Sequence, residues 1–583
     1  MSSDTASDRW NVRVWPGIAI VALIAFLMIV PANAVPRSMF HFMSFVSAPV
    51  LGAVLTIVWW LGFSRVRGPI KWGVLAAYLI PVIVLSMLEI LDGRVPMSPI
   101  VFGLPVVLCF WVLWLAVSFP LSRTARQYGT IAWIAASWVG FGMLRMDGTD
   151  AEMHPEFSFR FSPKPEDRAA EELKDRPTMV PAKPLSESKQ ESLDWAEFRG
   201  HYRDGVVRTG ALIDPDWETH PPKLLWKQKI GPGWGTFAVV GDRLFTQEQR
   251  GDNEAVVCYD AATGGEIWKH FETAKFKEEI SGAGPRATPT IAAGKLYAMG
   301  ATGTLLCLNA EDGKPIWKTD IKADTGGSPP QWGYASSPLV IGEFVIVYAG
   351  GTSGNGTSAF ETATGKFRWG SGKATHGYSS AQRATIGGVE QILMLSDWGL
   401  EAFEPKLGLP LWEYKWFIKG MNRSTQPTPL GNGEFLISTG VGTEMGTRRL
   451  KVSKDRYDWK VDVVWSSEKL RPYFNDGAIH DGHFYGFDDK KLVCADLKDG
   501  SIKWDVGTKF GHGQLVLLGE QGLLVIQAVD GKVHLLKASP EEPVELGKLN
   551  AIPGKTWNHP VVNRGKLYVR NGTWAAAYEM KGK

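Results

Sequence analysis

The chain has 583 residues, with 63 basic and 60 acidic side chains, so its formal net charge is only +3. A charge so close to neutral gives no reason to expect a nucleic-acid partner. The length permits more than one domain, and the composition changes sharply near residue 150.

Five apolar runs precede residue 150, and most of them are long enough to cross a bilayer as a helix of about 20 residues. They lie at about 15–34, 42–63, 70–91, 100–120 and 130–146, and the fifth is the shortest. Buried helices of a soluble core are the alternative, which so many long, charge-poor runs disfavour. We therefore predict a transmembrane helical domain of about five helices over residues 1–146.

Basic residues in the short loops predict the orientation of these helices, because such residues concentrate on the cytoplasmic side. One side holds seven of them and the other holds three: Arg9, Arg13, Arg65, Arg67, Lys71, Arg123 and Arg126 against Arg37, Arg94 and Arg145. This pattern predicts a multi-pass protein of the inner membrane with a cytoplasmic N-terminus. Five crossings then place the C-terminal part on the periplasmic side. Ala32-Asn33-Ala34 also matches a signal-peptidase site, and cleavage there would remove one helix without changing this topology.

Residues 147–194 are rich in Pro, Glu, Lys and Ser. Such a composition leaves little apolar surface to bury. We predict an extended extracytoplasmic linker there.

A motif recurs in the C-terminal two-thirds of the chain: a short strand, an acidic or amide residue, a turn containing Gly, and then tryptophan. Its copies are Cys258–Trp268, Cys307–Trp317, Ala359–Trp369, Cys494–Trp504 and, more loosely, Ala402–Trp412. Glycine suits the positive φ of such turns. We expect the tryptophan ring to pack between neighbouring sheets, where it can bury much apolar area.

The spacing of the motif predicts an eight-bladed β-propeller over residues 195–583. Tryptophans from Trp226 to Trp504 recur every 39 to 53 residues, and a four-stranded blade takes about 40–50 residues. Two further units follow Trp504, and the last of them lacks an outer strand. The segment 223–230 has the pattern to supply that strand. Pairing of the two ends would close the ring and remove exposed sheet edges.

These repeats resemble those of the PQQ-like (pyrroloquinoline-quinone-type) propellers. That family includes quinoprotein alcohol and sugar dehydrogenases, and also the propeller lipoprotein of outer-membrane protein assembly, which carries no cofactor. Three phrases are similar to one large bacterial subgroup: Trp195–Gly205, Gly284–Thr290 and Trp332–Pro338. The resemblance implies the propeller fold, but it leaves the function open because this fold hosts both catalysts and scaffolds.

Propellers are expected to bind ligands at the mouth of the central channel, where the segments that precede the innermost strands meet. Alignment of the repeats places a set of aromatic and polar residues there: Arg286, Trp332, Tyr334, Tyr378, Asn475, Trp557 and His559. Flat rings mixed with hydrogen-bond donors suit a planar or polyol ligand, and Arg286 could clamp a carboxylate. The alternative is that the rings pack the funnel while the polar groups cap strand ends.

The residues of a quinoprotein dehydrogenase are poorly represented. Such an enzyme needs a carboxylate base, oxygen ligands for Ca²⁺ and a flat slot for the quinone, and the family's alcohol dehydrogenases add two adjacent cysteines, which this chain lacks. Glu279, Asp397 and Asp476 are the nearest candidate carboxylates, although each could be an ordinary turn or strand-end residue. Three cysteines share one repeat position, so we expect small buried side chains and no metal site.

We therefore expect a membrane-anchored periplasmic propeller that binds envelope proteins as a non-catalytic module without a cofactor. The alternative is a dehydrogenase for sugars or alcohols that uses PQQ with Ca²⁺ and passes electrons to quinone. Its support is architectural, since five membrane helices followed by an exported propeller resemble the membrane-bound quinoprotein glucose dehydrogenases.

Overall fold

The computed structural model describes most of the chain, namely residues 10–35, 39–91, 95–149, 154–179, 184–185, 194–208, 212–278, 280–352, 354–418, 423–440, 445–456 and 458–580. The chain divides into two compact units. The helical unit contains residues up to Pro163 together with Glu278–Gly282, and the propeller unit contains Lys164–Lys277 and the residues from Ala283 onward.

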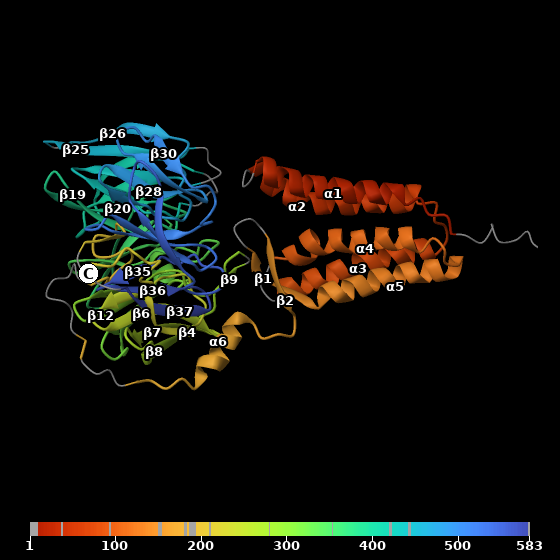
Figure 1. The fold of residues 1–583 in the computed structure, drawn as a ribbon, viewed down its shortest axis with the longest axis horizontal. Coiled ribbons are helices and arrows are strands. Elements are labelled where there is room, and N and C mark those ends of the chain that lie inside the picture. Colours follow the sequence, from red (N-terminus) through yellow and green to blue (C-terminus); the bar gives the residue numbers. More distant parts are fainter. Residues whose placement is uncertain are drawn as a thin grey trace, which may run out of the picture. The chain divides into compact units, whose positions relative to one another are not determined.

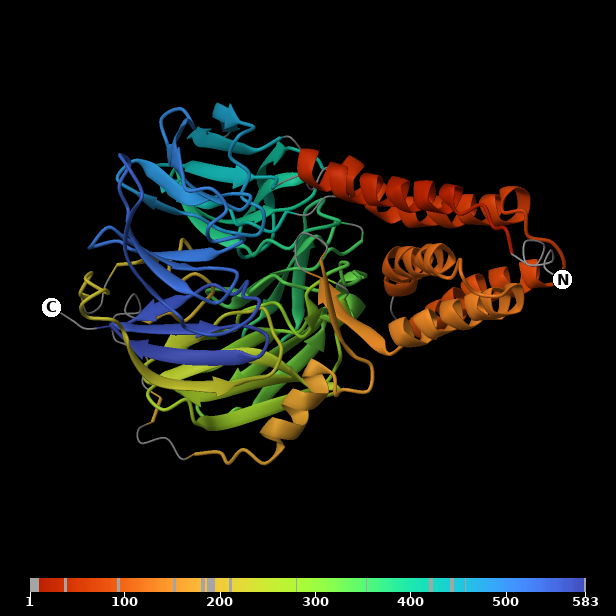
Figure 2. The same ribbon diagram turned by 45° about the vertical axis from the view of Figure 1, so that its right-hand side comes forward.

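Long helices that lie side by side build the helical unit (Figure 2). They are α1 (Trp15–Ala34), α2 (Met39–Val58) with its π-helical continuation η1 (Trp59–Phe63), α3 (Ile70–Leu91), η2 (Ser98–Gly103) leading into α4 (Leu104–Val117), and α5 (Arg123–Gly142). Trp59, Trp60 and Trp111 are buried at the centre with ring centroids 4.8–5.7 Å apart. Many other apolar side chains face outward, as expected for helices that associate with a membrane.

Four of the predicted spans are confirmed by length and composition. They are Trp15–Ala34, Phe40–Phe63, Ile70–Leu91 and Ser98–Val117. The fifth differs, because α5 begins before the predicted run, includes Arg123 and Arg126, and does not reach the apolarity of the other four among the described residues. Its 20 residues nevertheless pack along α3 and α4, and about 30 Å of helix is enough to cross a bilayer.

The segment that was predicted to be an extended linker contains regular structure. In the helical unit, β1 (Leu144–Thr149) pairs with β2 (Pro155–Phe159). In the propeller unit, α6 (Pro165–Lys174) packs on a strand of the first blade. Composition missed this helix because Pro165 sits in its first turn, where proline is tolerated, and because only two apolar residues, Ala169 and Leu173, lie on its buried face beside Glu166.

The propeller unit contains eight sheets that form the blades (Figure 1). Seven of them have four strands, and in blade 7 the short strand β3 joins the four strands of the blade as a fifth. In chain order, blade 1 contains β5 (Ala238–Val240), β6 (Arg243–Arg250), β7 (Asn253–Asp260) and β8 (Glu266–Thr273), and blade 2 contains β11 (Thr290–Ala292), β12 (Lys295–Met299), β13 (Thr304–Asn309) and β14 (Pro315–Asp320). Blade 3 contains β15 (Leu339–Ile341), β16 (Phe344–Tyr348), β17 (Thr357–Glu361) and β18 (Phe367–Ser371), and blade 4 contains β19 (Gln382–Ile386), β20 (Val389–Leu395), β21 (Gly399–Phe403) and β22 (Pro410–Lys415). Blade 5 contains β23 (Thr428–Gly431), β24 (Glu434–Ser438), β25 (Thr447–Asp455) and β26 (Asp458–Ser467), and blade 6 contains β27 (Ala478–His480), β28 (His483–Asp488), β29 (Lys491–Asp496) and β30 (Ile502–Asp505). Blade 7 contains β31 (Gln514–Leu518), β32 (Leu523–Gln527), β33 (Val533–Lys537) and β34 (Val544–Leu549), and blade 8 contains β35 (Val561–Asn563), β36 (Lys566–Arg570), β37 (Trp574–Glu579) and β4 (Lys223–Lys229). Shorter elements are β3 (Val206–Val207), β9 (Lys277–Glu278), β10 (Gly282–Ala283) and α7 (Ile321–Thr325).

The predicted closure of the ring is confirmed. Strand β4, from the start of the propeller sequence, pairs antiparallel with β37, the last strand of the chain, with Trp226 opposite Ala577. Blade 8 is therefore built from both ends of the domain, and the ring has no open seam.

The recurring tryptophan joins most blades to the next one, as predicted. Six indole Nε1 atoms donate to a carbonyl oxygen in the turn of the following blade: Trp226 to Ala261, Trp268 to Ala310, Trp317 to Thr362, Trp369 to Pro405, Trp465 to Leu497 and Trp504 to Ser539. Trp412 is different and donates to Gln391 Oε1 at 2.7 Å, because the long hairpin β25–β26 of the next blade lacks the glycine turn. The cysteines of the motif are buried and free, as expected.

The turn glycine of the motif leaves room for this ring. Gly365 has a φ of 72°, and a Cβ atom there would lie only 2.5 Å from the ring of Trp317 in the preceding blade. The motif thus requires glycine for two reasons, the backbone conformation and the space that the ring occupies.

Alanine substitutions separate these two reasons. Gly365 and Gly482 have similar φ angles, 72° and 76°. A Cβ atom at Gly365 would meet the ring of Trp317, whereas nothing lies within 4 Å of a Cβ atom at Gly482. We expect Gly365→Ala and Gly482→Ala each to lose about 1 kcal/mol through the strained backbone, and Gly365→Ala to lose a further ~1–3 kcal/mol by overpacking. Urea unfolding of the detergent-solubilised chain, followed by tryptophan fluorescence, measures the difference. Equal losses would show that the ring contact is unimportant.

Candidate functional site

The central channel of the propeller is occupied by a segment that we call the plug, residues 194–208. Trp195 exchanges backbone hydrogen bonds with Val239 in β5, and Ala196 O accepts from Ile291 N in β11. Further along, β3 pairs in parallel with β31 of blade 7. A segment this short can reach the first strands of several blades only from inside the ring.

Two buried arginines extend these contacts to other blades. Arg203 donates to Ser337 O and Pro338 O at the start of blade 3, and Arg199 donates to Gly477 O at the start of blade 6. Both side chains are almost fully buried, at 0% and 2% exposure. The plug therefore fills the channel with charged groups that are tied to the walls.

Carboxylates compensate the charges of these arginines. Arg203 pairs with Glu197 at 3.0 Å, and the other oxygen of Glu197 pairs with Arg383 of β19 at 2.5 Å. Arg199 lies 3.5 Å from Asp476. Loss of one partner in such a buried pair leaves an uncompensated charge, which costs several kcal/mol, so the network holds the plug in place.

His559, predicted at the channel mouth, lies against the plug. Its ring meets Phe198 edge-on with centroids 5.1 Å apart, and Nε2 is 3.8 Å from Asp476 Oδ2. Burial, with a smaller effect of Arg199, lowers the pKa of His559 to about 3. The imidazole is therefore neutral near pH 7 and cannot act as a general acid there.

Hydrogen bonds between neighbouring blades hold the wall of the channel. Thr236 N donates to Thr288 Oγ1 at 3.0 Å, Thr288 N to Ser337 Oγ at 2.9 Å, and Ser337 N to Ser380 Oγ at 2.8 Å. The phrases Gly284–Thr290 and Trp332–Pro338 supply two of these hydroxyl groups. These two phrases therefore fix the starts of the first strands.

Several of the predicted mouth residues meet as aromatic clusters. Trp332 stacks on Tyr378 with centroids 5.1 Å apart, and Trp332 N donates to Tyr378 Oη. Trp557 belongs to another cluster, with Trp234 at 5.2 Å and Phe474 at 5.4 Å. The structure therefore brings the predicted rings together in two groups rather than around one slot.

Tyr334 and Asn475 lie within the wall. Tyr334 is fully buried and its hydroxyl donates to Ala349 O at 3.2 Å. Asn475 is also fully buried, and its Nδ2 donates to Gly513 O at 2.6 Å. Repeat alignment gave the position of these residues along the chain, but it could not give the direction in which their side chains point.

Arg286 lies beside the ring of Phe276, with Cζ 4.5 Å from the centroid. Its positive charge acts on Glu254 at the start of β7, whose Oε1 accepts from Ala301 N at 3.1 Å. Burial raises the pKa of Glu254 to about 7, although the Ala301 hydrogen bond and Arg286 both act to lower it. Glu254 thus titrates near neutral pH, and sequence analysis missed it because it lies inside a strand.

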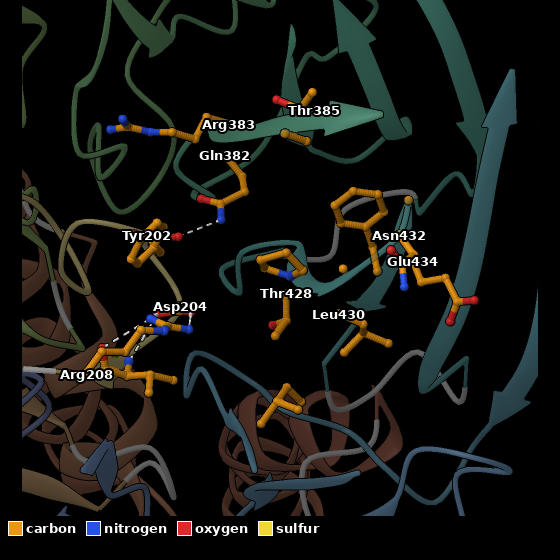
Figure 3. A pocket seen from close by; sticks show the side chains of 17 residues that line it. Tyr202, Asp204, Arg208, Gln382, Arg383, Thr385, Thr428, Leu430, Asn432 and Glu434 are labelled. Carbon is orange, nitrogen blue, oxygen red and sulfur yellow. Dashed lines mark hydrogen bonds and ion pairs between the residues drawn. The ribbon is translucent and has the colours of Figure 1, made fainter. Parts of the chain in front are cut away.

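An open pocket of about 540 Å³ lies beside the plug and was not predicted (Figure 3). Alternate plug residues form one side of it, and the other sides come from β19 and the β23–β24 hairpin. Its labelled lining residues are Tyr202, Asp204, Arg208, Gln382, Arg383, Thr385, Thr428, Leu430, Asn432 and Glu434. The spacing of Tyr202, Asp204, Val206 and Arg208 by two is the sequence signal that could have revealed this face.

The carboxylates considered for a quinone and calcium site are already engaged. Asp397 accepts from Thr375 N and Thr375 Oγ1 at 3.0 and 2.5 Å, and Asp476 accepts from Gln426 N and pairs with Arg199. Glu279 lies outside the described residues. Across the described part of the chain, no group of three or more His, Cys, Asp and Glu side chains could hold a metal ion. These residues do not fit a calcium-dependent quinone site.

Sequence comparison matches the family described as outer membrane protein assembly factor BamB, at residues 221–284 and 252–506. The propeller is a PQQ-like propeller. BamB of Shewanella oneidensis is 23% identical over 377 residues, which cover 60% of this chain and 86% of that protein. Polyvinylalcohol dehydrogenase of a Sphingopyxis species is 37% identical over 101 residues, only 17% of this chain and 15% of the enzyme.

Solved structures of both kinds share the propeller fold. BamB from Moraxella catarrhalis has a TM-score of 0.46 at 14% identity, covering 62% of this chain and 98% of its own. Quinohemoprotein alcohol dehydrogenase from Comamonas testosteroni has a TM-score of 0.47 at 13% identity, covering 72% and 84%. Because one fold can host unrelated functions, the function of this chain has to be argued from its own channel.

The raised pKa of Glu254 predicts a pH-dependent effect of Glu254→Gln. Between pH 4.5 and 7 the folded protein keeps a proton on Glu254 that the unfolded chain releases, so wild-type stability falls as pH rises through this window. Glutamine mimics the protonated form and avoids this loss. We expect the variant to match the wild type at pH 4.5 and to be about 3 kcal/mol more stable at pH 8, as measured by urea unfolding.

Arg286→Ala provides the companion test, because removal of its charge should move the same pH dependence to higher pH. A stability difference between Glu254→Gln and wild type that stays constant from pH 4.5 to 8 would contradict the assignment.

Proposed function

We propose that this protein is a membrane-anchored, non-catalytic binding module whose PQQ-like propeller recruits proteins of the cell envelope. The filled channel is the observation that carries this proposal. Arg199, Arg203 and Glu197 occupy the channel interior, and Arg199 pairs with Asp476, one of the carboxylates considered for a quinone site. The match to BamB, named as an assembly factor, supports the same class of function.

The residues that line the pocket beside the plug favour the binding of a partner segment there. Tyr202, Thr385 and Asn432 are exposed. Leu430, Val206 and Ile479 supply apolar surface, and the half-buried Arg383 supplies a donor. Such a mixture of an aromatic anchor, apolar contacts and polar groups is typical of protein-binding surfaces. Of the predicted mouth residues, Arg286, Trp332 and Trp557 are partly exposed and form a second candidate surface, with Arg286 as the charged group.

Periplasmic placement of the propeller belongs to the same proposal. An N-terminus in the cytoplasm and five crossings would deliver the propeller to the periplasm, provided that α5 crosses the inner membrane. The length of α5 and its packing along α3 and α4 support that crossing. With only four crossings, the propeller would lie on the same side as the N-terminus.

Blocking the pocket should prevent partner capture. We expect Thr385→Trp, which fills the pocket beside the plug, to reduce co-purification of cross-linked envelope proteins at least tenfold. Thr273→Trp, at an exposed position on β8, is the matched control and should leave capture unchanged. Arg286→Ala, assayed in parallel by quantitative mass spectrometry, tests whether the mouth contributes.

The enzyme alternative predicts a different result with the same preparation. Addition of PQQ and Ca²⁺ to the purified protein should produce neither a bound quinone absorbance nor dye reduction with sugars or alcohols. Either signal, or full partner capture by Thr385→Trp and Arg286→Ala alike, would contradict the binding-module proposal.

Cysteine labelling tests the orientation. Cys258, Cys307 and Cys494 are buried, so a Cys109→Ala background should react little with a membrane-impermeant maleimide. We expect Lys314→Cys, on an exposed propeller turn, to be labelled in intact spheroplasts. Arg67→Cys, in the loop before α3, should be labelled only after permeabilisation. The reverse pattern would place the propeller in the cytoplasm.

A further inference from the structure

Three arginines surround one pocket at an end of the helical unit. The pocket has a volume of about 350 Å³ and lies between the segment that precedes α1, the end of α4 and the start of α5. Arg13, Arg65 and Arg126 line it together with Leu115 and Phe119. It is remote in sequence and in role from the channel of the propeller.

The positive charges of this pocket are not balanced within the described residues. None of the three arginines has an ion pair with an acidic side chain in that part of the chain, and no carboxylate lines the pocket. Arg126 is only 4% exposed, and it donates to the neutral acceptors Trp10 O, Leu115 O and Ser118 Oγ. A buried cation without a counter-charge is costly, so an anion in the pocket would be strongly favoured.

The backbone at Arg65 adds an independent observation. Its φ is 66°, a left-handed conformation that side-chain-bearing residues rarely adopt. A glycine would take this conformation without strain, yet an arginine occupies the position and lines the pocket. Strain of this kind persists where the surrounding structure requires it, and such positions cluster at binding sites.

The position of the pocket indicates the source of the anion. Arg13 lies just before the apolar span that begins at Trp15, and Arg65 lies just after the span that ends at Phe63. The pocket is therefore at the depth of the lipid headgroups. Trp15, Val117 and Phe119 are exposed next to it, at 69%, 61% and 53%, and they offer apolar surface for acyl chains.

We propose that this pocket binds the phosphate headgroup of an anionic phospholipid. Arg126 forms the rigid base of the site, while Arg13 and Arg65 close over the phosphate from the two sides of the opening. Basic pockets between transmembrane helices bind anionic headgroups in this manner. The proposal depends on insertion of the helices in a membrane, and it holds whether or not the propeller binds proteins.

Lipid binding to the purified full-length protein tests this proposal. Dioctanoyl phosphatidylglycerol and dioctanoyl phosphatidylcholine are titrated into the detergent-solubilised protein and followed by native mass spectrometry and thermal shift. We expect the anionic lipid to bind roughly tenfold more tightly than the zwitterionic one. The double variant Arg13→Gln with Arg65→Gln should lose this preference, and both positions are exposed, so folding is preserved.

A matched control removes the same charge outside the pocket. Arg67→Gln with Arg123→Gln changes two exposed arginines near the same end of the helices, and we expect the preference for phosphatidylglycerol to stay within twofold of wild type. Equal losses in both double variants would mean diffuse charge attraction and would overturn the site. Inorganic phosphate that protects as well as the lipid would assign the pocket to a soluble anion, and absence of any lipid preference would also overturn the proposal.

Discussion

The contact between a tryptophan of one blade and the turn glycine of the next is the interaction on which the propeller depends. Each blade buries one face against its neighbour, so the stability of the ring depends on these interfaces, which we call joints. The joint between blades 8 and 1 uses the same chemistry, because Trp226 of β4 packs against Gly264 and donates to Ala261 O. Closure therefore adds no new kind of contact; it repeats the one already present.

The channel follows from these joints. With the blades held in register, the hydroxyls of Thr288, Ser337 and Ser380 connect the starts of successive first strands. The wall so formed presents carbonyl oxygens inward, and Arg199 and Arg203 bind to them. The channel is thus filled by side chains of the protein itself.

The sequence was sufficient to predict the fold because the motif is local. Each copy of the motif carries the glycine of one joint and, a few residues later, the tryptophan of the next joint. The pattern of 223–230 identified the closing strand. The site was less predictable. The contacts of Arg203 with Ser337 and Pro338 join residues more than 130 positions apart, and no local pattern reveals such a partner. Likewise, the spacing that located Tyr334 and Asn475 near the channel could not distinguish a lining side chain from a buried one.

The order of the plug and the closing strand along the chain has a consequence for biogenesis. The plug is synthesised before every blade, yet it ends up enclosed by all of them, and β4 can find β37 only after the last strand has emerged. The blades therefore assemble next to a segment that has already been synthesised. Both ends of the plug bind turns that follow first strands, since Gly241 N donates to Asp194 Oδ1 and Gly519 N donates to Val207 O. Once β4 and β37 have paired, the plug can therefore leave the closed ring only through one end of the channel.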